Sequence, residues 1–224
     1  MLKKKIIYVS IFVFLSLCVV ILIEYRFNYL SLTVNVVRPL FLNGGGDQCL
    51  GDLDKIGIKY IKLGESRENS CIIRNAVRIK NFPNTNLSGP VLLSCPTAKK
   101  VSQFFEEIEA KNIKHMGTYN CRSMRGSKIA SEHSYGTAID IAEIDGASIA
   151  YDWNQNTEKG LILKKAYSSA CRIFTNVLTP DSNSAHKNHF HLDAGIGIGC
   201  LPSWANNIKI DTVGFLNRIY NTIF

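Results

Sequence analysis

Histidines are concentrated in two short segments of this 224-residue chain, which holds five of them. His133 lies in the first segment, seven residues before Asp140, and His186, His189 and His191 lie in the second. A divalent cation must gather several neutral imidazoles and a carboxylate from separate parts of a chain. The clustering therefore predicts a metal site, and this mixture of ligands favours Zn²⁺.

The second histidine segment has the alternation of a β-strand. If residues 189–192 form a strand, His189 and His191 point to one face, while Phe190 and Leu192 point to the other. The apolar pair would enter the core. The imidazole pair would then line a cleft.

Asp140 interrupts the apolar run 138–142, where a strand of the core is expected. A buried charge there is costly unless a partner or a metal compensates it. Gly136 permits the turn that would bring His133 back over this strand. Taken singly, Asp140 could cap a turn or pair with an arginine, and His189 could be an ordinary strand residue. Taken together, the two segments favour a metal site.

The elements that must position these residues are predicted from apolar spacing. Residues 97–113 and 161–174 have helical periodicity, and residues 213–223 could form a terminal helix. The apolar runs 138–144 and 189–192 have the length of strands. The mixture indicates an α+β fold, with a small, mostly antiparallel sheet and helices packed beside it.

The N-terminal segment has the features of an export signal. Lysines at 3–5 precede an apolar run, 6–23, that is long enough to cross a bilayer and is followed by no small-residue cleavage site. We expect residues 1–26 to be an uncleaved transmembrane signal anchor, with a cleaved signal peptide as the alternative. Residues 27–48 are expected to be a linker that ends in three glycines, and residues 49–224 form the exported domain.

Cysteine usage agrees with export, because an even number of cysteines in an exported domain favours disulfides. Buried free thiols are the alternative, and a zinc cluster is disfavoured because no C-x-x-C spacing occurs. Sequence alone does not choose among the possible pairings. The cysteines are Cys49, Cys71, Cys95, Cys121, Cys171 and Cys200.

Charge and motifs exclude some functions. The formal net charge of +8 suits an anionic surface such as a cell wall or membrane. Lysines and arginines form no block interleaved with aromatics, so nucleic-acid binding is not expected. The chain also lacks both a phosphate-binding loop and a G-x-G-x-x-G turn, which disfavours nucleotide chemistry.

Two motifs resemble a known group of enzymes. S-E-H-S-Y-G-T-A-I-D at 131–140 and H-K-N-H-F-H-L-D at 186–193 resemble segments of zinc peptidases related to D-alanyl-D-alanine carboxypeptidases and murein endopeptidases. More closely, residues 49–200 are similar to the bacterial extensin-like C-terminal domain family. Further motifs of that family match Cys121-Arg122, Asp152-Trp153 and the Ala-Cys-x-x-Phe segment 170–174.

The resemblance implies a zinc-peptidase-like fold with His133, Asp140 and His191 as zinc ligands. It implies that His189 is a catalytic histidine beside the metal. In another branch of relatives a carboxylate base stands at the position of Asn188, so that base is missing here.

The missing carboxylate leaves the identity of the base open. His189 is the first candidate for the base and His186 the second. Arg122 resembles an arginine that contacts substrate in some relatives. Asp193 could orient an imidazole or occupy a turn.

The function expected is hydrolysis of peptide bonds in peptidoglycan stem peptides or cross-links by a zinc peptidase. Its domain would lie in the periplasm, tethered to the inner membrane through the N-terminal helix, or be exported if the signal is cleaved. Tyr135 and Trp153 would line the cleft or pack in the core.

Two alternatives remain. The first is a catalytically silent wall-binding module with a structural, four-ligand zinc site. The second is a disulfide-stapled structural protein that binds no metal.

Overall fold

The computed structural model describes residues 10, 13–19, 38, 42, 44–68, 71–195 and 200. Within these residues, no helix is long and apolar enough to cross a membrane. Most of the signal anchor expected over 1–26 lies outside the described residues. The terminal helix expected over 213–223 lies wholly outside them.

The larger sheet positions the histidine segments. Its strands follow the order β3–β5–β6–β9–β8, with β7 paired to β6. Only the short β3–β5 pairing is parallel, so the sheet is mostly antiparallel, as the sequence predicts. The bounds are Asn86–Leu87 (β3), Asn112–Gly117 (β5), Ala138–Ile144 (β6), Ala147–Ser148 (β7), Asn176–Leu178 (β8) and Phe190–Asp193 (β9).

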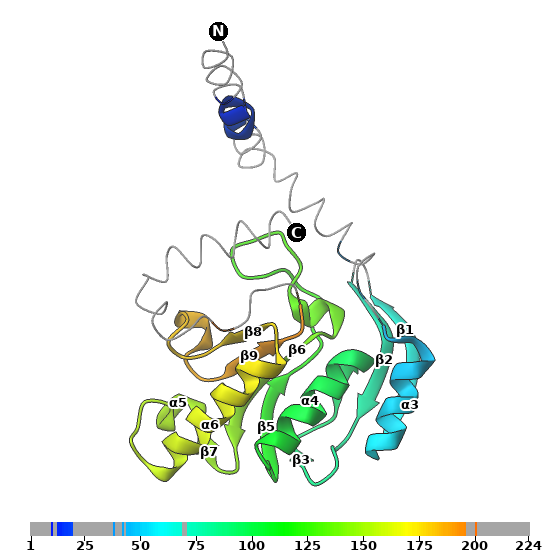
Figure 1. Ribbon diagram of the computed structural model, residues 1–224, viewed down its shortest axis with the longest axis vertical. Helices are drawn as coiled ribbons and strands as arrows, with labels where there is room; N and C mark the ends of the chain where they lie inside the picture. The colour runs from blue at the N-terminus through cyan, green and yellow to red at the C-terminus, as the bar shows by residue number, and fades with distance from the viewer. Residues whose placement is uncertain are drawn as a thin grey trace.

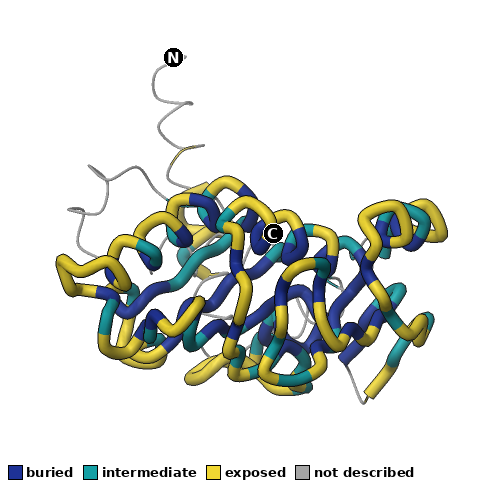
Figure 2. The backbone as a smooth tube through the Cα atoms, turned by 90° about the horizontal axis from the view of Figure 1, so that it is seen from below, coloured by how far each residue is buried: buried dark blue, intermediate teal, exposed yellow. Residues whose placement is uncertain are grey.

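Two long helices, α4 (Cys95–Glu107) and α6 (Glu158–Ile173), lie side by side over one face of this sheet (Figure 1). Phe104 of α4 packs edge-on against Phe174, which follows α6, at 5.7 Å between ring centroids. Buried residues run through the strands and the inward sides of the helices, and exposed residues lie on the outer turns (Figure 2). These contacts confirm an α+β fold.

The helix predicted over 97–113 is shorter than expected. Pro96 stands in its first turn, and the helix ends at Glu107. Glu109 then adopts a left-handed conformation with φ 58°, and the chain enters β5 at Asn112. The apolar spacing continues past this point because Ile113 is buried from the strand instead of the helix. The helix predicted over 161–174 is confirmed by α6.

A second sheet, which the sequence did not predict, has the order β1–β2–β4. Register shifts on both sides of Gly64 interrupt the alternation of β1, which explains why the pattern gave no strand signal. Helix α3 packs beside this sheet and begins at Gly46, inside the expected linker. The bounds are Gly46–Ile56 (α3), Tyr60–Glu68 (β1), Cys71–Ile79 (β2) and Val91–Ser94 (β4).

Three disulfides connect these elements, and they confirm the expected use of the six cysteines. The pairs are Cys49–Cys95, Cys71–Cys121 and Cys171–Cys200.

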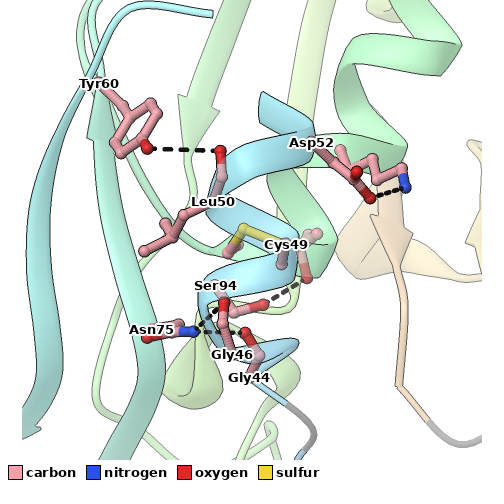
Figure 3. The surroundings of a disulfide bond; sticks show 11 residues. Gly44, Gly46, Cys49, Leu50, Asp52, Tyr60, Asn75 and Ser94 are labelled. Atoms are coloured by element: carbon pink, nitrogen blue, oxygen red, sulfur yellow. Dashed lines mark hydrogen bonds and ion pairs between the residues drawn. A yellow bond between two sulfur atoms is a disulfide. The ribbon is translucent and has the colours of Figure 1, made fainter. Parts of the chain in front are cut away.

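The first of these pairs joins α3 to the start of α4, as Figure 3 shows. Beside it, the Asn75 side-chain amide of β2 donates to the carbonyls of Gly44 and Gly46, at 3.0 and 2.8 Å. The start of α3 is thus held by a covalent bond and by the second sheet.

Candidate metal centre

Asp140 and His191 face each other across two neighbouring strands. Strands β6 and β9 pair antiparallel, and their register places Asp140 directly opposite His191. Ile139 and Ile141 on β6, like Phe190 on β9, are fully buried in the core. Because side chains alternate along a strand, Asp140 and His191 project from the sheet face opposite the core.

His133 reaches the same place from a short 3₁₀ helix, η1 (Glu132–Tyr135). The Ser131 hydroxyl caps the start of this helix by accepting a hydrogen bond from the His133 backbone N–H, at 3.4 Å. Gly136 ends it with φ 63°, in the left-handed region that glycine adopts without strain. The turn expected at Gly136 is confirmed, and it brings the imidazole back over β6.

Three side-chain atoms converge as the ligands of a metal would. His133 Nε2 lies 3.1 Å from Asp140 Oδ2, and His191 Nδ1 lies 2.9 Å from Asp140 Oδ1. The two imidazole nitrogens lie 3.2 Å apart. One ligand atom from each residue lies within 4.8 Å of the others, so the three could hold one ion.

Hydrogen bonds behind the imidazoles favour the ligand atoms needed. His133 Nδ1 donates to the backbone carbonyl of Thr118 at 2.6 Å, which leaves Nε2, on the Asp140 side, as the atom that could bind a metal. His191 Nε2 donates to Asp193 Oδ2 at 3.0 Å, which leaves Nδ1 for a metal. Asn176 fixes Asp193 in turn by donating to Oδ1 at 2.8 Å. Such outer contacts orient metal-binding histidines, so the donor set fits Zn²⁺.

The electrostatics of the cluster also suit a cation. Burial would raise the pKa of Asp140, but hydrogen bonds from His133 and His191 outweigh it and hold this pKa well below its usual range. Burial lowers the pKa of His191, yet its hydrogen bonds to Asp140 and Asp193 raise that pKa to about 10. A divalent cation bound here would replace the His191 proton as the partner of the Asp140 charge.

His189 and His186 stand next to this cluster. His189 Nε2 lies 3.7 Å from Asp140 Oδ1, and its ring centroid lies 5.0 Å from that of His186. The His186 ring also lies 5.7 Å from the His191 ring. Burial is the main cause that lowers the pKa of His189 and that brings the pKa of His186 to about 4. The lowered pKa values keep both imidazoles neutral near pH 7.

Arg122 lies on the loop between β5 and η1, which the Cys71–Cys121 disulfide ties to β2. Its backbone N–H donates to the Ser134 hydroxyl at 3.1 Å, and its exposed side chain contacts the Ser123 carbonyl. Burial is the largest cause of the lowered pKa of His189, the charges of His191 and His133 follow, and the positive charge of Arg122 contributes least. Arg122 thus lies near the histidines, and within the described residues its side chain forms no hydrogen bond or ion pair with the three candidate ligands.

Tyr135 and Trp153 are buried at 2% and 5% exposure, so they pack in the interior and do not line an open cleft. The Trp153 ring lies edge-on to Phe190 at 5.1 Å, and its Nε1 donates to Asp181. Asp193 occupies the orienting position considered for it, behind His191.

Thr118 is a functional residue that sequence reasoning missed. It contributes a backbone carbonyl, which has no signature in residue type. Register shifts in β5 between His115 and Gly117 precede it, and Gly117 has φ 154°. The Thr118 hydroxyl accepts from the Leu92 N–H at 3.0 Å, so the same residue links the second sheet to the His133 imidazole.

An aspartate and a histidine on neighbouring strands, with a second histidine from η1, define a candidate metal-binding domain of α+β fold. Residues 47–200 match the family described as "Extensin-like protein C-terminus", and the chain belongs to that family. No match was found among curated proteins or among solved structures.

Proposed function

We propose that this chain is a zinc-dependent peptidase that cleaves peptide bonds in peptidoglycan outside the cytoplasmic membrane. The observation that carries the proposal is the convergence of His133, Asp140 and His191, with His189 beside them and outside the three-ligand group. Three protein ligands leave a coordination position open, which is the arrangement of catalytic zinc sites. The resemblance to murein peptidases supports the same chemistry.

Zinc held by these ligands would supply a water of lowered pKa and polarise the carbonyl of the substrate. His189 would accept a proton from that water and return it to the leaving amine, because a neutral imidazole suits both tasks near pH 7. His186 is the second candidate for this role. Arg122 would stabilise the developing oxyanion or bind a carboxylate of the substrate.

Three disulfides and the lysine-flanked apolar segment 6–23 support an oxidising compartment and a membrane anchor. Peptidoglycan peptides are the substrate that such a tethered domain meets, and the net charge of +8 favours an anionic wall. The location proposed is the periplasmic face of the inner membrane.

The test is a digest of purified peptidoglycan by the detergent-solubilised chain, folded under oxidising conditions and loaded with zinc. Mass spectrometry would follow the products beside a His191→Ala control. We expect new fragments that the control does not produce, and their masses would name the bond. An unchanged profile with zinc bound would contradict the peptidase and favour a wall-binding module whose zinc stabilises only the fold.

A further inference from the structure

A partly buried ion pair lies at the start of η1. Glu132 precedes the ligand His133, and both of its carboxylate oxygens accept hydrogen bonds from Arg38 Nη2, at 2.5 and 2.6 Å. The Arg38 side chain is 9% exposed and that of Glu132 is 19% exposed. Arg38 comes from far upstream, nine residues before the matched region 47–200 begins.

The pair contacts several groups that position the metal ligands. Thr137, between η1 and β6, donates its hydroxyl to Glu132 Oε2 at 2.6 Å. The Arg38 guanidinium lies 5.5 Å from the centroid of the Tyr135 ring, at the other end of η1. Gly195, just after β9, lies so close to Glu132 that a Cβ there would overlap the carboxylate. Arg38 therefore touches both ends of the turn that carries His133.

The charges explain why this arrangement needs the arginine. Glu132 is a poorly exposed carboxylate close enough to Asp193 for the two negative charges to interact. Asp193 is also the residue that orients His191. Removing the cation from a buried pair leaves an uncompensated charge, which is strongly destabilising. Without Arg38, Glu132 would take up a proton or move toward water, and either change would alter the contacts that hold η1.

We propose that Arg38 is a positioning residue of the metal centre: through Glu132 it fixes His133, and by compensating Glu132 it protects the Asp193–His191 contact. The inference rests on the proposed function only in taking zinc as the ion. It makes Arg38 part of the functional domain, although this residue lies outside the family match.

The experiment measures metal binding, not catalysis. In the full chain, Arg38→Gln is compared with the unchanged protein for its zinc Kd, determined by chelator competition, and for the visible absorption spectrum of bound Co²⁺. We expect the variant to bind zinc about 10–100-fold more weakly, as when other outer contacts of ligands are removed. Arg38→Lys, which keeps the charge, should recover part of the loss.

A matched control is Arg172→Gln, which breaks the exposed ion pair between α6 and Glu107 of α4. It should leave both the zinc Kd and the Co²⁺ spectrum unchanged. An Arg38→Gln variant that is folded, and that also shows an unchanged Kd and spectrum, would overturn the proposal.

A double variant covers the case in which Arg38→Gln fails to fold. Arg38→Gln with Glu132→Gln removes both charges, so we expect it to fold, because no charge is left unpaired, and to bind zinc more weakly than the unchanged protein. If the double variant binds zinc like the unchanged protein, the positioning role is wrong. Tight zinc binding without peptidoglycan cleavage would contradict the peptidase but not this role, whereas an unchanged protein that binds no zinc would overturn both.

Discussion

Each ligand of the candidate metal centre depends on a second residue behind it. The Thr118 carbonyl sets the tautomer of His133, and Asp193 sets that of His191, so the two imidazoles present different nitrogens to one point. His189 has another kind of partner, because its Nδ1 contacts the side-chain oxygen of Asn188 at 2.9 Å. A neutral amide raises the basicity of an imidazole less than a carboxylate does. This partner therefore suits a histidine that carries protons more than one that binds a metal.

We expect His189→Gln to separate catalysis from metal binding. Cleavage of peptidoglycan should fall at least about 100-fold, because general acid–base catalysis contributes that much or more. The zinc Kd should stay unchanged, since the three ligands do not include His189. His115→Gln is the control, because His115 lies on β5 and contacts Gly89 instead of the cluster. Loss of zinc in His189→Gln would show a fourth ligand and favour a structural site.

The elements differ in how tightly they define the site. Strands β6 and β9 are fixed by their register and by a fully buried face, whereas η1 is one turn long and depends on the residues around it. Gly136 is central to that dependence. Its carbonyl accepts from the Ser94 N–H at 2.9 Å, which joins η1 to the second sheet.

Replacing Gly136 by alanine should destabilise the domain through two causes. At φ 63° a side chain is strained, and a Cβ would lie 2.9 Å from Ile73 Cγ2 and 3.0 Å from the Ser94 nitrogen. We expect the free energy of unfolding to fall by about 2–4 kcal/mol, the sum of backbone strain and overpacking.

Gly146 offers a matched control for this experiment. It has φ 79°, and a Cβ there would meet nothing within 4 Å. Gly146→Ala should cost only the strain, about 1 kcal/mol. Denaturant unfolding of both variants would check this, and equal losses would mean that contact with the second sheet contributes nothing.

The sequence was informative where chemistry depends on residue type and local spacing. The clustered histidines, and Asp140 within an apolar run, were enough to predict a metal site, and strand alternation placed His189 and His191 on one face. The choice of His133, Asp140 and His191 as ligands came from the resemblance to zinc peptidases. The partners that hold them could not be chosen. The Thr118 contact uses a backbone carbonyl, and Arg38 meets Glu132 across 94 residues, so neither leaves a local pattern.

At the scale of the whole molecule, covalent bonds link elements whose buried side chains also belong to one hydrophobic core. The Cys71–Cys121 bond joins the second sheet to the loop that carries Arg122, and Cys171–Cys200 joins α6 to the segment after β9. The second sheet meets the site mainly through β2 and η1. The Cys71–Cys121 bond therefore ties the loop that carries Arg122 to the second sheet.

Removing the Cys71–Cys121 bond by alanine substitution of both residues should lower the free energy of unfolding by about 2–4 kcal/mol, since the bond closes a long loop. Cleavage activity should fall further than zinc affinity does, because Arg122 follows the released cysteine directly. Denaturant unfolding and zinc titration would measure the two effects. Cys18→Ala, at a free cysteine, is the control and should change neither. If zinc affinity fell as much as activity, the bond would be supporting the whole metal centre, and a role confined to the Arg122 loop would be contradicted.

The Arg38–Glu132 pair also bears on how far the domain can travel. With Arg38 held against the domain, only the fourteen residues 24–37 separate it from the apolar segment 6–23. Fully extended, such a length spans at most about 50 Å. If that segment is embedded in the bilayer, the fourteen residues keep Arg38 within about 50 Å of the membrane. If peptidoglycan is the substrate, as proposed, the strands within reach are then the ones nearest the membrane.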